Sequence, residues 1–457
     1  MSLAQPRRDA PFMPQEWIHR YHEVKLTRGS DGSSITVPCT AANFFLMDLN
    51  PRWYFDGLAK AKGKSLFILY LDTTNSCTDA CPMCFTMATR EQEGMNQRLD
   101  IDLSLTRIAE LRERYPETFR MVSMAGPGEP LNLPRIEDLI LGTARQGLAV
   151  RVYTAGRKLN KSSIRSALLE GTSLVRVSVD AASKDTYRAT HAVDDFEERM
   201  ESIRTLVGER TARGSGPLIG LHFVIQKANF REIIPFAEMA RGMGCDFVVY
   251  GQETFGKVAG GFSTAEKEQV VADLAAVEAM HAPDFAAVVP RLVRRQTYTA
   301  FDKNYVASIE TLNGCHNSRH RIFFGVQNDF SACWLATMDA SFREESYIGK
   351  LSEESTMSKV LQIIDHGVGD GLGRPAKLSC NTCVAGNYNS MVDKVLAFLD
   401  GEDDWESEVI EHVPAQSHDA EYEFRLVGGS PDEVLSVGVE EIRSAGRKLL
   451  PVISTQV

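Results

Sequence analysis

The stretch "KSLFILYLDTTNSCTDACPMC", residues 64–84, combines two signals that decide how this chain folds. Its first half is a continuous apolar run, which is typical of a strand buried on both faces in a parallel sheet. Its second half places Cys77, Cys81 and Cys84 in one short loop, although the whole chain of 457 residues has nine cysteines. We therefore expect a buried strand that delivers three thiols to a single site.

The same strand pattern recurs along the chain, with a helical pattern between successive strands. The apolar runs, between residues 65 and 251, are "SLFILYLD", "RMVSMAG", "LAVRVYTAG", "SLVRVSVDA", "PLIGLHFVIQ" and "CDFVVYG". This alternation predicts an α/β fold with a parallel sheet and helical crossovers. Six such units fit an open doubly wound sheet or an incomplete eight-unit barrel, and in both the active residues follow the carboxyl ends of the strands. The cysteine loop follows the first strand, so we expect a catalytic rather than a peripheral structural site.

Composition and charge narrow the class of protein. The chain is 43% hydrophobic and 24% charged, as in soluble globular proteins. A net charge of −11 argues against a broad nucleic-acid-binding face. The sequence has no apolar run of membrane-spanning length and no apolar signal-peptide core at its amino end. We expect a cytoplasmic protein without nucleic-acid or membrane partners. In the cytoplasm, clustered cysteines indicate metal or redox chemistry more often than disulfides.

Two groups of cysteines offer different ligand sets. The first, Cys77, Cys81 and Cys84, has no adjacent histidine or fourth cysteine, so it is a poor zinc site. It suits a four-iron, four-sulfur (4Fe-4S) cluster with one iron left open. The second group offers four thiols, enough for a closed shell around a cluster or a structural zinc, and comprises Cys315, Cys333, Cys380 and Cys383.

The spacing Cys-x3-Cys-x2-Cys after the first strand resembles the signature of radical S-adenosylmethionine (SAM) enzymes. The resemblance spans the six strand–helix units and implies a partial (β/α)6 TIM-like barrel. It implies that the open iron binds SAM. One electron, from a reductase such as flavodoxin or ferredoxin, then cleaves SAM to methionine and a 5′-deoxyadenosyl radical, which abstracts a hydrogen atom from the substrate.

Further positions match the SAM-binding pattern of that family. "GPGEP" after the second strand resembles the GGE motif, which implies that Gly126, Gly128 and Glu129 receive the methionine end of SAM. Pro127 departs from the usual glycine and lacks an N–H donor. The other implied contacts are Ser178 and Asp180 for the ribose, Arg188 for the SAM carboxylate, and Met83 and Phe85 near the adenine. Taken singly, these residues also fit a turn, a helix N-cap or a surface arginine.

Beside such a core, the second cysteine group resembles the auxiliary-cluster domains of the SPASM/twitch subfamily, and four cysteines imply one auxiliary 4Fe-4S cluster. The predicted organisation is an N-terminal extension at 1–64, the radical SAM partial barrel at 65–255, a helical connector at 256–312, a C-terminal cysteine-rich twitch/SPASM auxiliary domain at 313–399, and an acidic linker with a tail at 400–457.

The substrate is less constrained than the cofactors. The auxiliary-cluster count resembles twitch enzymes of antibiotic biosynthesis. This favours a small polar substrate, such as an amino sugar, aminocyclitol or nucleotide sugar, that undergoes dehydrogenation, dehydration or epimerisation. The alternatives are a maturase of a precursor peptide, by crosslinking or epimerisation, and a non-catalytic iron–sulfur or zinc scaffold.

Three residues are candidates for catalysis or substrate contact. Cys39, in the N-terminal extension, is a candidate hydrogen-atom donor, because epimerases of this family use a free thiol. Cys245 begins the sixth strand, so it is expected at the wrong end of the barrel. Tyr250 and Gln226 end strands, and we predict that they point toward the barrel mouth. His222, inside a strand, is expected to be structural.

Overall fold

The computed structural model describes residues 22–39, 51–84, 86–87, 90, 94, 96–252, 262–289, 315–333, 346–368 and 386–411. All six predicted strand–helix units are present. Their strands are β3 (Ile68–Asp72), β4 (Met121–Ala125), β5 (Ala149–Thr154), β6 (Leu174–Ser178), β7 (Leu218–Ile225) and β8 (Phe247–Gln252). The helices between and after them are α3 (Ile101–Arg114), α4 (Ile136–Arg145), α5 (Ser162–Gly171), α6 (Lys184–His191), α7 (Phe196–Arg213), α8 (Ile233–Gly242) and α9 (Thr264–Glu278).

Two strands that the sequence did not predict extend the parallel sheet on both sides. β9 (Ala286–Val288) pairs parallel to β8, and β10 (Arg321–Gly325) pairs parallel to β3. An antiparallel hairpin of β11 (Asp329–Ser331) and β12 (Tyr347–Lys350) continues beyond β10. The sheet has ten strands in the order β12-β11-β10-β3-β4-β5-β6-β7-β8-β9. The predicted count of six strands was therefore too low, because β9 and β10 are short and lie in segments predicted as a connector and as an auxiliary domain.

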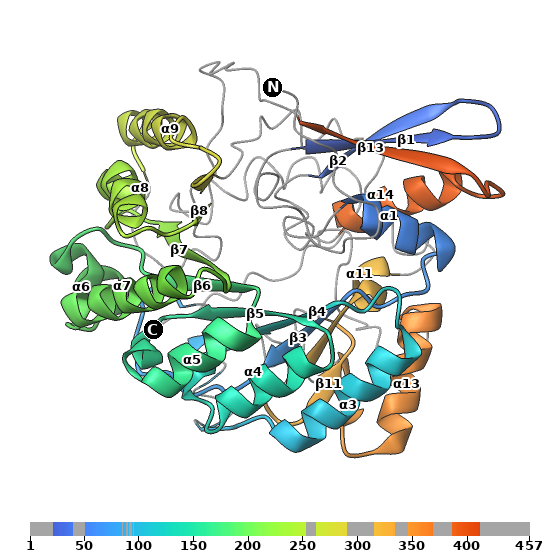
Figure 1. The fold of residues 1–457 in the computed structure, drawn as a ribbon, viewed down its shortest axis with the longest axis horizontal. Helices are drawn as coiled ribbons and strands as arrows, with labels where there is room; N and C mark the ends of the chain where they lie inside the picture. Colours follow the sequence, from blue (N-terminus) through green and yellow to red (C-terminus); the bar gives the residue numbers. More distant parts are fainter. Residues whose placement is uncertain are drawn as a thin grey trace, which may run out of the picture.

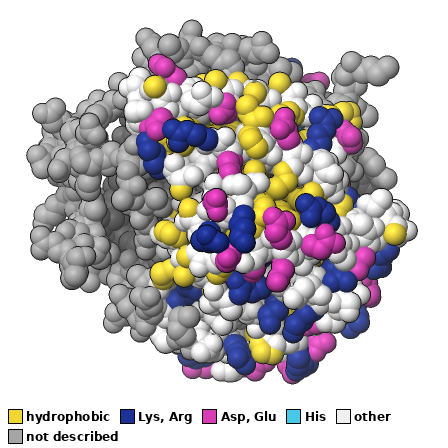
Figure 2. Space-filling view, turned by 90° about the vertical axis from the view of Figure 1, so that its left-hand side faces the viewer, with side chains coloured by type: hydrophobic (Ala, Val, Ile, Leu, Met, Phe, Trp, Pro, Cys, Tyr) yellow, Lys and Arg dark blue, Asp and Glu magenta, His cyan; other side chains and the backbone are white. Residues whose placement is uncertain are grey.

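The sheet curves, and helices cover its outer face (Figure 1). Alternate side chains of each strand point to that face. Val122, Val150 and Val175 of three neighbouring strands share one buried core with Ile108 of α3 and Leu139 of α4. Burying each such side chain contributes about 1.5–3 kcal/mol. On the side where α6–α9 lie, the described surface carries basic and acidic side chains close together, with small apolar patches between them (Figure 2).

A second, three-stranded antiparallel sheet joins distant parts of the chain. It contains β1 (His22–Arg28), β2 (Ser34–Cys39) and β13 (Trp405–Glu411), in the order β13-β1-β2. The helices α1 (Pro51–Lys60) and α14 (Gly386–Phe398) pack beside it (Figure 1). The prediction of an acidic linker is wrong for Trp405–Glu411, because Val409 pairs opposite Val24 in this sheet.

The remaining described helices are α11 (His316–His320) and α13 (Glu354–His366), which contact each other. In the described parts of the chain, no helix combines the length and the apolar character needed to cross a membrane.

Candidate functional site

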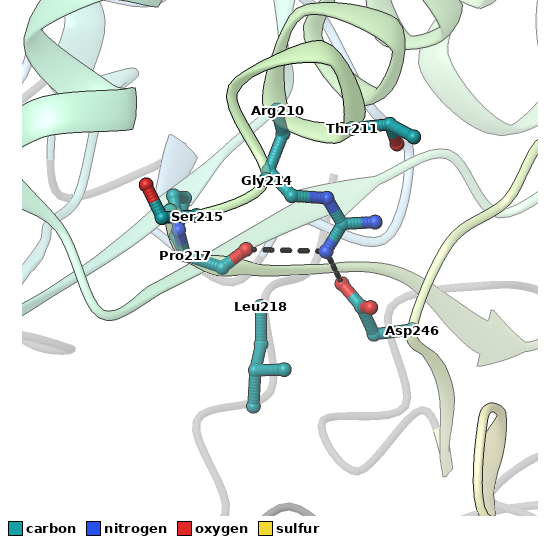
Figure 3. Close-up of a pocket in the computed structure, with 8 residues that line it drawn as sticks. Arg210, Thr211, Gly214, Ser215, Pro217, Leu218 and Asp246 are labelled. Carbon is teal, nitrogen blue, oxygen red and sulfur yellow. Dashed lines mark hydrogen bonds and ion pairs between the residues drawn. The ribbon is translucent and has the colours of Figure 1, made fainter.

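The two ends of the parallel sheet differ in what they carry. At the amino end, a cavity of about 390 Å³ lies between the C-terminal end of α7 and the start of β7 (Figure 3). Arg210 Nη1 and Asp246 Oδ2 form an ion pair 2.6 Å long across it. The cysteine loop follows β3 at the carboxyl end, so this cavity is separate from the candidate site.

The cysteine loop is held against the loop that follows β4. The N–H groups of Gly128 and Glu129 donate to the carbonyls of Thr74, at 3.0 Å, and Ser76, at 2.9 Å. A Cβ at position 128 would lie 2.6 Å from backbone atoms of Thr74, Asn75 and Ser76. Gly128 is therefore required for the close approach of the two loops. Gly126 also needs glycine, because its φ is +143°.

The structure brings all three predicted thiols onto this loop. Cys77, Cys81 and Cys84 are free and half-buried. Burial raises the pKa of Cys77 to about 11, and the nearby charges of Asp79 and Glu129 add to the rise. Cys84 Sγ accepts a hydrogen bond from Arg90 Nη2 at 3.6 Å and lies 3.3 Å from the Thr86 hydroxyl. This short loop therefore carries three half-buried thiols that form no disulfide.

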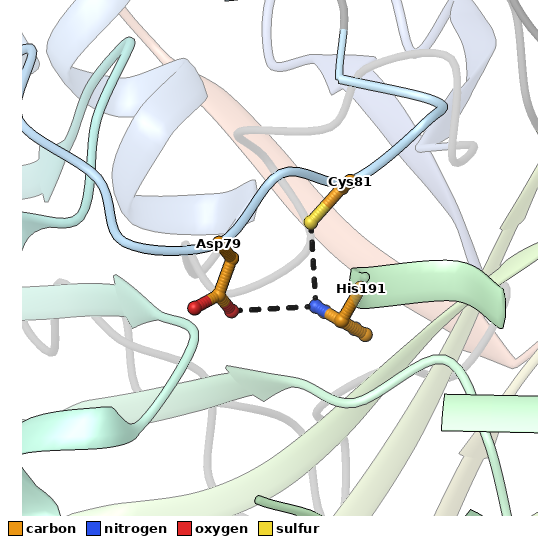
Figure 4. Close-up of side chains that lie close together, drawn as sticks. All are labelled: Asp79, Cys81 and His191. Atoms are coloured by element: carbon orange, nitrogen blue, oxygen red, sulfur yellow. Dashed lines mark hydrogen bonds and ion pairs between the residues drawn. The ribbon is translucent and has the colours of Figure 1, made fainter. Parts of the chain in front are cut away.

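A buried charged network lies behind Cys81. His191 Nδ1 is 3.4 Å from Cys81 Sγ and 3.5 Å from Asp79 Oδ2 (Figure 4). Its Nε2 is 3.1 Å from Asp180 Oδ2. Burial lowers the pKa of His191, but the bonds to Asp180, Asp79 and Cys81 outweigh burial and hold the pKa well above its usual range. These contacts therefore favour the protonated form of the imidazole.

Two arginines complete this network around Asp79. Arg199 Nη2 lies 3.7 Å and Arg157 Nη2 3.5 Å from its carboxylate oxygens. Burial raises the pKa of Asp79, but the bond from His191 and the charges of Arg199 and Arg157 outweigh it, so the net shift is downward. Sequence reasoning missed Asp79, His191, Arg157 and Arg199. The available signals were an aspartate between two clustered cysteines and a histidine three residues after Arg188 on the same helix.

Glu129 joins the ends of two strands. Its carboxylate accepts hydrogen bonds from the Thr154 hydroxyl, from Ala155 N at 2.6 Å and from Leu131 N at 3.1 Å. The residue is 3% exposed, and burial raises its pKa. In this geometry, Glu129 orders the carboxyl ends of β4 and β5.

Asp180 faces the network rather than capping a helix. Its carboxylate accepts from Val224 N at 2.5 Å, in addition to the contact with His191. Its φ is +57°, and the N-cap of α6 is Ser183. Ser178 is half-buried at the end of β6.

Other predicted residues lie away from the cysteines. Arg188, predicted to meet the SAM carboxylate, forms a surface ion pair with Asp194 at 2.9 Å. Tyr250 does not point toward the mouth, so that prediction is wrong. Its hydroxyl donates to the Ile233 carbonyl at 2.6 Å, and its ring packs on Phe236 of α8. Because successive side chains of a strand alternate between faces, Tyr250 belongs to the helix-facing side of β8.

Some of the remaining sequence candidates have described side chains, and the others do not. Gln226 is buried in the turn after β7, where its N–H donates to Asn229 Oδ1 at 2.7 Å, and Met83 is half-buried in the cysteine loop. Cys245 is buried in the core, and burial raises its pKa to about 12. Cys39 ends β2, but its side chain lies outside the described residues, as do Phe85, Cys380 and Cys383.

The described half of the second cysteine group consists of Cys315 and Cys333, both half-buried. Asn389 Nδ2 donates to Cys315 Sγ at 3.6 Å. Because Cys380 and Cys383 are not described, the four-cysteine site stays a prediction.

Comparison with known proteins identifies part of the chain. Residues 71–240 match the model of the radical SAM superfamily. The tungsten-containing aldehyde ferredoxin oxidoreductase cofactor-modifying protein of Pyrococcus furiosus is 29% identical over 181 residues, which are 39% of this chain and 49% of that protein. A probable GTP 3′,8-cyclase of Saccharolobus solfataricus is 24% identical over 182 residues, 40% of this chain and 55% of that protein. The chain thus spans about half the length of these curated relatives.

A solved structure shares the fold. Streptococcus suis SuiB bound to S-adenosylmethionine aligns with a TM-score of 0.50 at 12% identity, over 74% of this chain and 75% of that one. At this identity the likeness concerns the fold alone. It agrees with the predicted α/β architecture built on a parallel sheet.

Proposed function

We propose that the radical SAM superfamily domain of this chain holds a 4Fe-4S cluster on Cys77, Cys81 and Cys84 and cleaves SAM reductively. The observation that carries this proposal is the position of three free thiols on one loop, at the carboxyl end of the first strand of the family-matched segment. Cluster and SAM, when bound, supply a 5′-deoxyadenosyl radical that takes a hydrogen atom from the substrate. The electron comes from a reductase such as flavodoxin or ferredoxin.

The surroundings of the thiols fit this cofactor. Thiolates are the usual ligands of iron–sulfur clusters, and hydrogen bonds to the sulfurs tune such clusters. Arg90 donates to Cys84, and His191, whose pKa is raised by its neighbours, lies beside Cys81. The Arg90 cation offsets negative charge on the ligands.

A mononuclear metal on Asp79, Cys81 and His191 is the competing interpretation, because their ligand atoms lie within 4.8 Å of one another. Two observations disfavour it. Asp79 already faces Arg199 and Arg157, and the contacts of His191 with Asp180 and Asp79 raise its pKa and so favour the protonated form. A histidine ligand must be neutral.

The remaining residues have proposed roles in holding SAM. Gly126 and Gly128 let two loops approach closely, and we assign Glu129 and Asp180 to ordering the strand ends around the SAM site. Ser178 and Met83 stay proposed contacts for the ribose and the adenine. Arg188 is the weakest of these assignments, because Asp194 already pairs with it.

A second 4Fe-4S cluster on Cys315, Cys333, Cys380 and Cys383 is also proposed, as expected for a twitch-type auxiliary site. Its support is the count of four cysteines in the C-terminal part of the chain. Zinc is the alternative occupant of the same ligands.

We favour a small polar substrate over a precursor peptide. One relative is named for a reaction of GTP and another for the modification of a cofactor, and neither name refers to a peptide. Within this class, the amino sugar, aminocyclitol or nucleotide sugar and the outcome of dehydrogenation, dehydration or epimerisation stay predictions.

Anaerobic reconstitution tests the proposal. Iron, sulfide and dithionite-driven SAM cleavage are measured in the wild type, in Cys77→Ala/Cys81→Ala/Cys84→Ala, and in Cys245→Ala as a control for loss of an unrelated buried cysteine. A fall from about eight irons to about four, with cleavage lost only in the triple variant, supports both clusters. A fall from about four irons to none, with zinc retained, supports the SAM site and assigns zinc to the second. Absence of iron from every protein rejects the proposal.

A further inference from the structure

The face of the parallel sheet that points away from the helices is basic. Strand alternation places Arg151 of β5, Arg176 of β6 and Arg321 of β10 on this face. At the described positions of this face in β3–β10, Asp72 supplies the one carboxylate, at the end of β3. The chain as a whole carries a net charge of −11, so this concentration of positive charge runs against its composition.

Arg176 is the most informative of these residues. It is half-buried, and its Cζ lies 4.0 Å from the centre of the Tyr153 ring on the neighbouring strand. Among the described residues, its buried Nε has no hydrogen-bond partner. A guanidinium carries five N–H donors, and a buried donor without an acceptor is unfavourable. The side chain is therefore positioned by an aromatic ring, and part of its donor set has no acceptor in the described structure.

Arg151 lies close to the same ring. Its Cζ is 5.8 Å from the Tyr153 centroid, and its Nε donates to the Ser123 hydroxyl at 3.0 Å. Two guanidinium groups thus approach one tyrosine from adjacent strands.

The pKa of His222 is lowered in part by the same positive charge. It lies on the same face of β7, and burial, together with the charge of Arg176, lowers its pKa to about 3. The imidazole is therefore neutral and supplies no further positive charge.

These residues lie near the catalytic end of the sheet. Tyr153 precedes Thr154, which bonds to Glu129, and Arg176 lies two residues before the end of β6. A ligand held by them on this face would be near the end of the sheet that carries the cysteine loop.

We propose that Arg176 and Arg151, with Tyr153 between them, bind an anionic oxygen group of the substrate, a carboxylate or a phosphate. This inference rests on the proposed function, because it assigns a chemical class to the molecule that loses a hydrogen atom. A planar guanidinium binds two oxygens of such a group at once, which fixes orientation as well as affinity.

Equilibrium binding to the reconstituted full-length protein tests this site. Calorimetric titrations use inorganic pyrophosphate and malonate as probes, with wild type, Arg176→Gln, Arg176→Lys and Arg204→Gln. Arg204 is an exposed arginine of α7 that pairs with Glu201. We expect Arg176→Gln to weaken binding by about tenfold or more, Arg176→Lys to weaken it less, and Arg204→Gln to leave it unchanged. Binding of pyrophosphate alone identifies a phosphate, and binding of malonate alone identifies a carboxylate.

Two results overturn the inference. One is that neither probe binds, or that both bind Arg176→Gln as tightly as wild type while circular dichroism shows the variant to be folded. The other is that saturating SAM displaces the probe and Arg176→Gln loses SAM affinity, which would assign the arginine to SAM. Failure of the wild type to cleave SAM, with probe binding intact, would instead reject only the proposed function.

Discussion

The two cysteine-bearing regions of the molecule stabilise their buried polar groups in different ways. Around Cys81, the buried neighbours are ionisable: His191, Asp79 and Arg199 lie close together, and the contacts of His191 raise its pKa. Near Cys315, His316 Nε2 lies 2.8 Å from Asp393 Oδ1, but the described donor to the sulfur is a neutral amide. Asn389 donates to the sulfur, and His320 donates from Nε2 to the Gly63 carbonyl at 2.9 Å.

This difference has a physical meaning. A buried charge is tolerated only with a partner, so a compact set of alternating charges constrains the geometry strongly. In the first region a cationic donor, Arg90, contacts the sulfur of Cys84 directly, whereas the described donor to the sulfur of Cys315 is the neutral amide of Asn389. The two regions therefore differ in the charge of the groups that contact the described sulfurs.

The largest expected effect separates the two cysteine groups directly. Cys81→Ala should abolish dithionite-driven SAM cleavage, because it removes a ligand of the proposed catalytic cluster. Cys315→Ala should retain cleavage, because it affects only the proposed auxiliary site. Counting 5′-deoxyadenosine by chromatography checks both variants, and loss of cleavage in Cys315→Ala would contradict the division between the regions.

The buried network itself is tested by two arginines of one helix. Arg199→Met removes a buried cation from Asp79 and Asp195 and leaves Arg157 as their arginine partner, so we expect a loss of about 3 kcal/mol in the free energy of unfolding, the lower end for breaking a buried pair. Arg204→Met, five residues later on α7, removes only an exposed pair with Glu201 and should cost about 0–1 kcal/mol. Denaturant titration measures both. Equal losses would show that the network contributes no more than a surface ion pair.

The contact between the cysteine loop and the β4 loop is tested by a pair of glycines. Gly128→Ala forces a Cβ against three backbone atoms and should destabilise the protein by about 1–3 kcal/mol. Gly208→Ala, in open space on α7, should stabilise it by up to about 1 kcal/mol. Thermal unfolding with iron analysis gives the outcome, and an unchanged midpoint in Gly128→Ala would show that the loops separate freely.

Acid should act on the region of Cys315 through His320. Burial, with the charge of His316, lowers the pKa of His320 well below its usual range. Below a pH of about 6.5, the imidazole of His320 is therefore protonated in the unfolded chain but stays neutral in the folded chain. Below this pH, the free energy of unfolding falls by about 1.4 kcal/mol per pH unit on acidification. Above it, His320 makes no pH-dependent contribution. His320→Gln should reduce this slope between pH 7.5 and 5.5 in denaturant titrations. An unchanged slope would mean that His320 does not titrate as described.

The smallest expected effect concerns the electronic role of His191. His191→Gln removes an imidazole next to Cys81 whose contacts favour its protonated form, and should lower the reduction potential of the proposed first cluster by roughly 40 mV, equivalent to about 1 kcal/mol for one electron. His222→Gln is the control, since burial keeps that imidazole neutral. A redox titration followed by electron paramagnetic resonance compares them. Equal potentials in His191→Gln and wild type would assign His191 a purely structural role.

The sequence predicted local elements better than it predicted contacts between distant segments. The strands β3–β8 follow continuous apolar runs, so the sequence predicted all of them. β10 is short, and it is recognised as part of the parallel sheet only by its pairing with β3, a strand about 250 residues earlier. Tyr250 shows a finer limit, since a shift of one residue along a strand decides which face a side chain occupies.

By itself, the sequence determined the strand–helix alternation and the three-thiol loop, because apolar periodicity and cysteine spacing are local properties of the chain. The tertiary structure alone decided that Asp79, His191, Asp180 and Arg199 form one buried network, because they come from four separate segments. It also decided that Arg151 and Arg176 share the Tyr153 ring, through the register of adjacent strands. Charges separated along a chain become partners only when folding removes the water between them.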